Sequence, residues 1–307
     1  MDFLATDLCG LSLSSPIVLA AGTCGYIDEM KDILDFARIG AITTKSITPK
    51  ERAGNPPLRV LDVKAGMINS VGLANMGLDG FLKEKTIVAE QVPTRVIGSI
   101  AGFSIDDYTT VAQAFNQVDA FPIVELNVSC PNHSEGQRPT DSPELLRAHV
   151  EAVRAVLDRT RLFVKLPPLT EGLVSLAEAA IEGGADGLTL VNTLEVMSID
   201  VDSRRSRFGR NYKGMSGPGI HPLAVRLIHE VYEGVARDAG VPIIGLGGVQ
   251  DWRDAAEFVL AGATAVGMGT ALFIDPSSPR RVLDGLQKWT RQQGCASIRE
   301  LVGAYEE

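Results

Sequence analysis

Strand-like and helix-like segments alternate along almost all of the 307 residues, and this alternation constrains the fold more than any other feature. Short apolar runs typical of buried strands occur at residues 17–20, 41–44, 95–100, 122–128, 162–166, 187–191, 241–246 and 263–268. Segments with helical patterning follow them at residues 28–38, 77–91, 105–118, 142–158, 171–182, 221–236, 251–260 and 279–292. Strand-then-helix units repeated in this way predict an α/β protein, a (β/α)₈ TIM barrel forming one domain over residues 1–307.

A doubly wound open sheet is the structural alternative. It would normally carry a Gly-x-Gly-x-x-Gly fingerprint after an early strand, and this sequence has none there. Residues 49–76 and 192–219 are too long for plain connections, so we expect inserted loops at the carboxyl-terminal face of the barrel. The first of these, rich in Gly, Pro and Asn, is expected to contain a small hairpin.

Charge and cysteine usage exclude several classes of function. A net charge of −9 argues against nucleic-acid binding, which needs a basic face. The four cysteines contain no Cys-x-x-Cys pair and the four histidines show no metal spacing, so no metal site is expected. The longest apolar stretch, residues 258–274, is broken by three glycines, so no membrane segment is expected. A cytoplasmic protein without structural disulfides is the expectation.

The strand predicted at residues 122–128 ends in a polar loop that carries a reactive side chain. Pro131 biases Cys130 towards an extended backbone, so Asn127, Cys130 and Asn132 are expected at the strand's carboxyl end. That end is the working face of a parallel barrel. The alternatives are that Cys130 is a buried small hydrophobe and that the asparagines only close a turn.

Two glycine runs follow the last two predicted strands, at residues 245–248 and 267–269. Barrels commonly bind phosphate in the loops after strands seven and eight, because glycine lets backbone amides approach an anion. Each run alone could mark only a tight turn. Together they fit the phosphate of a mononucleotide such as FMN, and equally a sugar phosphate.

Two lysines, Lys45 and Lys165, lie at or near strand ends. A lysine within an apolar strand needs a partner, so Lys165 could form a salt bridge with Glu125 on the neighbouring strand. The other interpretation is that one or both lysines neutralise a bound cofactor or substrate.

The run Asn127-Val128-Ser129-Cys130-Pro131-Asn132 resembles that of the class 1 dihydroorotate dehydrogenases, flavin enzymes of pyrimidine biosynthesis. The likeness continues in order along nearly the whole chain, at residues 41–46, 52–56, 69–75, 164–166, 192–194, 216–219 and 245–248. It implies FMN-dependent oxidation of dihydroorotate to orotate, in which Cys130 removes a proton from C5 while hydride leaves C6 for the flavin.

The resemblance also assigns roles to individual residues. Cys130 and Lys45 would be catalytic. The substrate would be held by Lys45, Asn69, Ser70, Val71, Gly72, Leu73, Asn127, Asn132, Asn192 and Thr193. The flavin would be lined by Ala21, Lys45, Ser46, Ser99, Asn127, Lys165, Val191 and Gly217, with its phosphate at Gly247, Gly248, Gly269 and Thr270.

The length and the sequence pattern of this chain resemble class 1B more than the fumarate-reducing homodimers of class 1A. Class 1B implies a partner subunit that carries FAD and a 2Fe-2S cluster and passes electrons to NAD⁺. We therefore expect a homodimer or a heterotetramer with that partner. The basic loop at residues 204–210 is either a solvated face or a docking site for the partner. His133, beside the catalytic loop, receives no role.

Some residues depart from the family pattern. Cys24 stands where an aromatic residue is common, Ser99 where asparagine is frequent, and Glu195-Val196 where glycine is usual. We expect these positions at the rim of the pocket, which leaves a related dihydropyrimidine oxidoreductase as an alternative. An aldolase-type barrel using Lys165 for a Schiff base and a non-catalytic phosphate-binding barrel are the alternatives from other classes.

Overall fold

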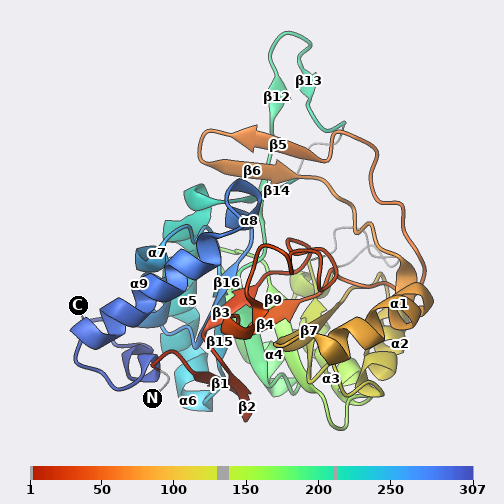
Figure 1. The fold of residues 1–307 in the computed structure, drawn as a ribbon. Coiled ribbons are helices and arrows are strands. Elements are labelled where there is room, and N and C mark those ends of the chain that lie inside the picture. The colour runs from red at the N-terminus through yellow and green to blue at the C-terminus, as the bar shows by residue number, and fades with distance from the viewer. Residues whose placement is uncertain (1–2, 130–137, 210–212, 307) are drawn as a thin grey trace.

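The computed structural model describes residues 3–129, 138–209 and 213–306. Within them, eight parallel strands form a closed barrel surrounded by helices, which confirms the predicted TIM barrel (Figure 1). Neighbouring strands follow chain order around the barrel, and the last pairs with the first. The barrel strands are β3 (Ile17–Leu19), β4 (Ala41–Thr43), β7 (Arg95–Ile100), β8 (Ile123–Asn127), β9 (Arg161–Leu166), β10 (Gly187–Leu190), β15 (Ile243–Leu246) and β16 (Ala265–Met268).

Helices cover the outside of the barrel and begin where the sequence indicates. Ser142 accepts a hydrogen bond from the amide of Leu145 at the start of α3, and Pro143 occupies the first turn, where its missing N–H costs nothing. The long helices are α1 (Gly77–Gln91), α2 (Ile105–Asn116), α3 (Pro143–Arg154), α4 (Leu173–Glu182), α5 (His221–Val231), α7 (Trp252–Leu260) and α9 (Ser278–Gln292).

Short helical segments complete this layer. After α5 the chain continues through the π-helical turn η4 (Tyr232–Ala236) into α6 (Arg237–Ala239), and α8 (Ala271–Ile274) follows the last barrel strand. Short 3₁₀ turns occur at η1 (Phe36–Arg38), η2 (Pro139–Asp141), η3 (Pro218–Ile220) and η5 (Ile298–Leu301). No helix in the described part of the chain has the length and apolar character needed to cross a bilayer.

The helix predicted at residues 28–38 is wrong. These residues form successive turns that end in the 3₁₀ helix η1. Ile33 is 58% exposed, so the buried anchors of the segment are Leu34 and Phe36, with Met30 partly buried against the core. Two anchors separated by one residue do not make a helical face, and Asp35 caps the 3₁₀ turn by accepting from the amide of Ala37.

An antiparallel hairpin that we did not predict closes the amino-terminal end of the barrel. It consists of β1 (Thr6–Leu8) and β2 (Leu11–Leu13). Leu8, Leu11 and Leu13 are buried and form one cluster with barrel-strand residues such as Ile97 and Phe163. The hairpin therefore seals this end with hydrocarbon and leaves the opposite end for a ligand.

A four-stranded antiparallel sheet stands over the carboxyl-terminal end of the barrel (Figure 1). Its order is β11 (Leu194–Val196), β14 (Lys213–Ser216), β6 (Gly66–Asn69) and β5 (Val60–Val63). The pair β5–β6 confirms the hairpin expected in the first insertion. The long loop expected at residues 192–219 instead contains strands, and one of them, β14, pairs with β6 from far away in the sequence.

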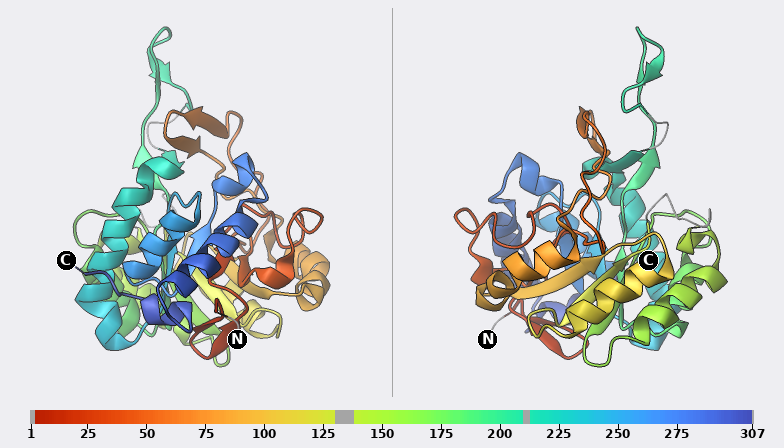
Figure 2. Two further views of the ribbon diagram at one scale, coloured as in Figure 1. Left: turned by 60° about the vertical axis from the view of Figure 1, so that its left-hand side comes forward. Right: turned by 90° about the vertical axis from the view of Figure 1, so that its right-hand side faces the viewer.

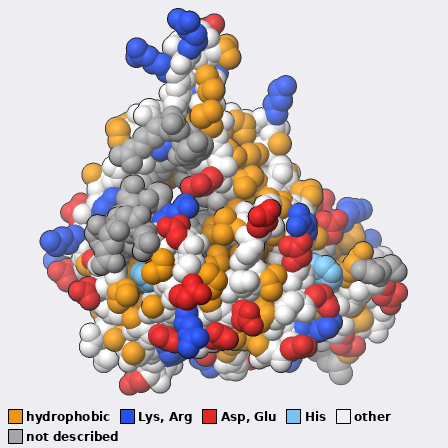
Figure 3. Space-filling view, turned by 180° about the vertical axis from the view of Figure 1, so that it is seen from behind, with side chains coloured by type: hydrophobic (Ala, Val, Ile, Leu, Met, Phe, Trp, Pro, Cys, Tyr) orange, Lys and Arg blue, Asp and Glu red, His pale blue; other side chains and the backbone are white. Residues whose placement is uncertain are grey.

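Between β11 and β14 the chain forms an arm that projects from the mouth of the barrel (Figure 2). The arm contains the short strands β12 (Ile199–Asp200) and β13 (Arg205–Ser206). Arg204 lies in the turn at its end, with Arg205 and Arg207 on the returning side, and all three are exposed, as are Met197, Ile199 and Val201. Basic and hydrophobic side chains are both visible on the arm in Figure 3. The described part of the basic loop, residues 204–209, thus belongs to a projecting arm, and its docking role stays a prediction.

Candidate active site

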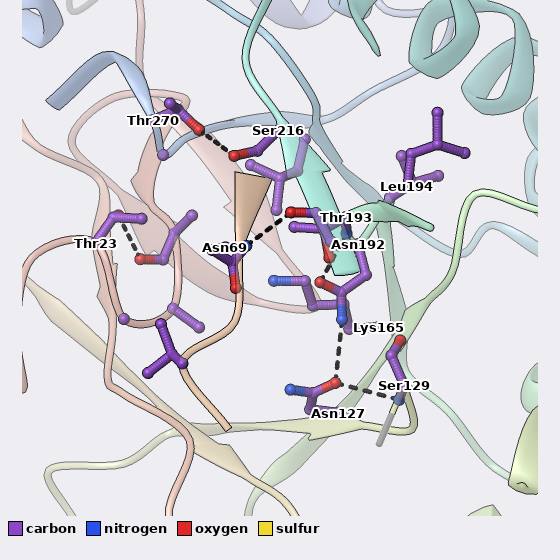
Figure 4. A pocket seen from close by; sticks show the side chains of 18 of the residues that line it. Thr23, Asn69, Asn127, Ser129, Lys165, Asn192, Thr193, Leu194, Ser216 and Thr270 are labelled. Atoms are coloured by element: carbon purple, nitrogen blue, oxygen red, sulfur yellow. Dashed lines mark hydrogen bonds between the residues drawn. The ribbon is translucent and has the colours of Figure 1, made fainter. Parts of the chain in front are cut away.

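A cavity of about 800 Å³ lies between the carboxyl ends of the barrel strands and the sheet above them (Figure 4). Most of the site residues expected from the sequence line this one cavity, although they come from both insertions and from most of the barrel strands. They are Ala21, Lys45, Ser46, Asn69, Ser70, Val71, Gly72, Leu73, Asn127, Lys165, Val191, Asn192, Thr193, Gly217, Gly247, Gly248, Gly269 and Thr270.

The side-chain amide of Asn127 is fixed by three neighbours at the end of β8. Its Oδ1 accepts hydrogen bonds from Asn192 Nδ2 at 3.2 Å and from the amide of Ser129 at 3.3 Å. Its Nδ2 donates to Ser46 Oγ at 3.2 Å. Because the donor and acceptor ends are both engaged, the orientation of Asn127 is set by the protein rather than by a ligand.

A buried carboxylate anchors this network from below. Glu125, inside β8, accepts hydrogen bonds from Thr189 Oγ1 at 3.0 Å and from Ser99 Oγ at 3.4 Å. Lys165 Nζ lies 4.0 Å from Glu125 Oε1, and the two side chains are only 7% and 3% exposed. The salt bridge that we considered for Lys165 is therefore present, while Lys165 also lines the cavity.

Ser99 does not line the cavity. It is fully buried, and its Oγ lies 2.8 Å from Ser46 Oγ. With Ser99 donating to Glu125 and Asn127 donating to Ser46, the Ser46 hydroxyl donates to Ser99. Ser99 thus supports Ser46, which does line the cavity, and its contact with the flavin stays a prediction.

Lys45 brings positive charge to the wall of the cavity, and Arg59 lies near it. Burial lowers the pKa of Lys45, and the nearby charge of Arg59 lowers this pKa further. Arg59 is held in place by donating to the backbone carbonyls of Asn55 and Ala53, each at 2.7 Å. Two cations kept close together in a partly buried place favour an anionic ligand.

Two polar atoms at the cavity wall are buried without a hydrogen-bond partner among the described residues. They are Arg52 Nε and Ser129 Oγ. The Arg52 guanidinium also lies 4.5 Å from the centre of the Phe103 ring. Buried polar atoms are rarely left unsatisfied in native proteins, so these two favour a polar molecule in the cavity. Neither residue received a role in the site from the sequence, although both fall within the motifs that resemble the family.

The glycine loops meet at the other end of the cavity. Gly248 has a φ of +77°, and a Cβ there would lie 2.7 Å from the carbonyl oxygen of Gly217. Only glycine fits such a position, and its small size brings the loop's backbone close to the cavity. Thr270 Oγ1 donates to Ser216 Oγ at 2.7 Å, which joins the loop after β16 to β14. Ser216, which we did not assign, also lines the cavity.

The sheet above the barrel supplies the roof. Asn69, at the end of β6, donates from Nδ2 to the carbonyl of Gly214 in β14 at 3.2 Å. Asn55 Nδ2 donates to the carbonyl and hydroxyl oxygens of Ser70, at 3.2 and 3.0 Å. The substrate residues expected from the first insertion are therefore held by its own fold and by β14.

Cys130 and Asn132 lie outside the described residues, as does His133. Ser129, directly before Cys130, lines the cavity.

The departures from the family pattern differ in their placement. Cys24 is fully buried in the core and not at the rim, so that expectation is wrong. Burial, followed by the charge of Glu29, raises its pKa to about 11. Glu195 does line the cavity, and its carboxylate lies 3.6 Å from Arg138 Nη1. Among the described residues, no group of three or more His, Cys, Asp or Glu side chains is arranged to hold a metal ion.

Comparison with known proteins gives consistent matches. Residues 3–289 match the family model described as dihydroorotate dehydrogenase. A catalytic subunit of dihydroorotate dehydrogenase B (NAD⁺) from Bacteroides thetaiotaomicron is 40% identical over 307 residues, covering 100% of both chains. Another, from Trichlorobacter lovleyi, is 38% identical over 99% of this chain and 98% of its own length.

A relative whose name gives a different electron acceptor has the same sequence identity to this chain. A putative dihydroorotate dehydrogenase A (fumarate) from Solibacter usitatus is 40% identical over 98% of this chain and 97% of its own length. Among solved structures, DHODH from Eimeria tenella in complex with ferulenol superposes with a TM-score of 0.83 at 24% identity. That match covers 99% of this chain and 89% of the other, and it supports the barrel fold.

Proposed function

Because the chain belongs to the dihydroorotate dehydrogenase family, we propose that it oxidises dihydroorotate to orotate in pyrimidine biosynthesis, with FMN as its flavin. One observation carries this proposal beyond the family match. A single cavity is lined by the asparagine cluster, by the cation Lys45 and by the paired glycine loops, and Arg59 lies close enough to Lys45 to lower its pKa. A planar substrate, a flavin ring and the flavin phosphate each find suitable groups there.

The residues present fit FMN. The loops at residues 247–248 and 269–270 would hold the phosphate, and Lys165 would supply positive charge to the flavin ring. Ser46, Asn127 and Val191 would line the ring. Arg52 and Ser129, whose buried polar atoms have no partner among the described residues, support a polar occupant. When bound, FMN supplies the acceptor for the hydride that leaves C6 of dihydroorotate.

The chain's own residues would position the substrate and remove its proton. Asn69, Asn127 and Asn192 present amide groups for the pyrimidine ring, and Asn127 is already oriented by its neighbours. Lys45 would pair with the substrate carboxylate. Cys130 would take the proton from C5 onto Sγ, a role that rests on the resemblance.

The cation pair also bears on which dihydropyrimidine is bound. Dihydroorotate carries a carboxylate, whereas dihydrouracil has none. Arg59 stands close enough to Lys45 to lower the pKa of that lysine, and positive charge gathered here favours the anionic substrate. Family membership likewise favours this oxidoreductase over the aldolase-type and non-catalytic barrels.

Anaerobic spectroscopy tests the proposal. The purified protein should be yellow and should bleach when dihydroorotate is added, but not with dihydrouracil. Colourless protein that cannot be reconstituted with FMN would contradict the cofactor assignment, and bleaching by dihydrouracil alone would contradict the substrate.

A cysteine variant tests the base. Cys130→Ser should slow flavin reduction about a hundredfold or more in stopped-flow measurements while the bound flavin content stays unchanged. Cys295→Ser, a partly exposed thiol elsewhere, is the matched control and should reduce its flavin at the parental rate. A parental rate in Cys130→Ser would reject Cys130 as the base.

For the electron acceptor we propose NAD⁺, reached through a partner subunit that carries FAD and a 2Fe-2S cluster. The similarity to catalytic subunits of the B type supports this, whereas the equally similar A-type relative keeps fumarate as the alternative. We expect a homodimer of this chain within a heterotetramer. Affinity purification from its own cells should retain an iron–sulfur flavoprotein, and fumarate-dependent turnover by the isolated chain would favour the A type.

A further inference from the structure

His221 is a buried histidine that the proposed mechanism does not use. It is the first residue of α5 and is only 7% exposed. Its Nδ1 lies 2.8 Å from the carbonyl oxygen of Gly247, and its Nε2 lies 3.0 Å from Glu257 Oε2 on α7. Its ring also packs on Phe258, with the ring centres 4.7 Å apart. His221 therefore links the glycine loop after β15 to two helices.

Both hydrogen-bond partners of the ring are acceptors. A backbone carbonyl has no proton to give, so Nδ1 must donate to Gly247. A carboxylate also only accepts, so Nε2 must donate to Glu257. A neutral imidazole carries one N–H and satisfies one of these contacts, whereas an imidazolium satisfies both. The geometry thus fits His221 as a cation.

A positive charge at the start of a helix must be offset by nearby negative charge. His221 opens a helix, where the positive end of the helix dipole disfavours positive charge. Among the described residues, the charged groups placed against it by ion-pair distances are Glu257 and, at 3.9 Å, Asp254, both on α7. Asp254 also caps α7 by accepting from the amides of Gln250 and Asp251. The two carboxylates place negative charge beside the ring and so offset the dipole.

The other side of His221 faces the glycine loop. A Cβ added to Gly248 would lie 2.9 Å from His221 Cβ and 3.1 Å from the His221 amide nitrogen. Gly247 and Gly248 line the cavity, and their backbone forms part of the candidate phosphate site. The histidine therefore stands directly behind the loop, on the side away from the ligand.

We propose that His221 is a positioning residue for the flavin phosphate. Its Nδ1 donates to Gly247 and fixes the loop, while its positive charge favours a dianionic phosphate on the cavity side. This inference rests on the proposed function, because the phosphate in question is that of FMN. Part of the affinity for the phosphate would then come from the side chain of His221 and not only from the backbone amides of the glycine loop.

Flavin affinity tests the proposal without using activity. Dissociation constants of FMN and of riboflavin, which lacks the phosphate, are measured for apoprotein by flavin fluorescence. His221→Asn keeps a donor near the position of Nδ1 but removes the charge. It should weaken FMN binding about tenfold and leave riboflavin binding nearly unchanged, so that the FMN dissociation constant divided by the riboflavin dissociation constant rises about tenfold. A purely structural role would weaken both flavins together.

Further variants make the test decisive. His221→Lys restores a positive charge and should recover most of the FMN preference. His229→Asn, on the same helix but packed against Tyr305, is the matched control and should keep the parental ratio. If His221→Asn is poorly folded by circular dichroism, His221→Gln gives the same comparison with a longer neutral side chain.

The possible failures are distinguishable. A parental ratio in both neutral variants, with FMN bound normally by the parent, would overturn the role of His221 alone. A parent that binds neither flavin would overturn the proposed function itself.

Discussion

The buried pair Lys165–Glu125 gives the sharpest prediction about the energetics of the site. Nζ and Oε1 are 4.0 Å apart. At an effective dielectric constant of about 20, two unit charges at that distance attract by about 4 kcal/mol. Replacing Lys165 by methionine keeps most of the hydrocarbon stem and removes the charge. The carboxylate of Glu125 then stays buried with only the hydroxyls of Thr189 and Ser99 to stabilise it.

We expect Lys165→Met to lower the free energy of unfolding by about 3 kcal/mol, because breaking a buried ion pair leaves an uncompensated charge. Glu125→Gln should destabilise for the same reason, with Lys165 now unpaired. The double variant has no charge at either position, and a glutamine there can accept from one hydroxyl through its oxygen and donate to the other through its amide nitrogen. The decrease in its free energy of unfolding should be smaller than the sum of the decreases in the two single variants by at least about 2 kcal/mol.

The assay is urea unfolding of apoprotein, followed by tryptophan fluorescence and far-ultraviolet circular dichroism. FMN must be removed first, since a ligand that binds only the folded state raises the apparent stability. Lys288→Met, at an exposed position on α9, is the matched control and should change stability by less than about 0.5 kcal/mol. If the double variant lost as much free energy of unfolding as the two single variants together, the inferred Lys165–Glu125 ion pair would be refuted.

Two further predictions concern pH. Burial and Arg59 lower the pKa of Lys45, so the unfolded chain holds that proton more tightly and stability should rise with pH up to the ordinary lysine range. Lys45→Met should therefore raise the melting temperature of apoprotein at pH 7, and this increase should become smaller towards pH 10. The same variant should bind dihydroorotate more weakly in titrations. A lower melting temperature at pH 7 would contradict the argument. Burial raises the pKa of Cys9 and of Cys24 from 9.0 to about 11, so their contribution to stability is present below pH 9 and is lost as pH rises through 11. Pulsed alkylation at pH 8 with mass spectrometry should leave both thiols unmodified until the protein unfolds, and rapid native labelling of Cys24 would disprove its burial.

Local sequence determined the barrel and the location of its working end. Buried strands and amphipathic helices have different periods, and Ser142 with Pro143 marks a helix start, so the strand-then-helix order could be predicted from short stretches of chain. Residues just after barrel strands, such as Asn127 and Lys45, necessarily gather at one end of a parallel barrel. Their place in one cavity therefore followed from the fold class.

Local patterning failed where few residues anchor a segment. Residues 28–38 contain enough apolar side chains to resemble a helix, but Ile33 faces solvent and only Leu34 and Phe36 of the segment's large apolar side chains are buried. Whether an apolar residue is buried depends on the surface packed against it, which short-range periodicity does not contain.

Only the tertiary structure decided how the site is closed and supported. Asn69 bonds to Gly214, 145 residues away, so the roof of the cavity depends on a pairing that no local pattern encodes. The same holds for Ser99, which proved to support Ser46 from behind, and for His221, whose two acceptors come from different segments of the chain. Local sequence fixes the period of each element and its end residues, whereas contacts between distant elements depend on how those elements pack.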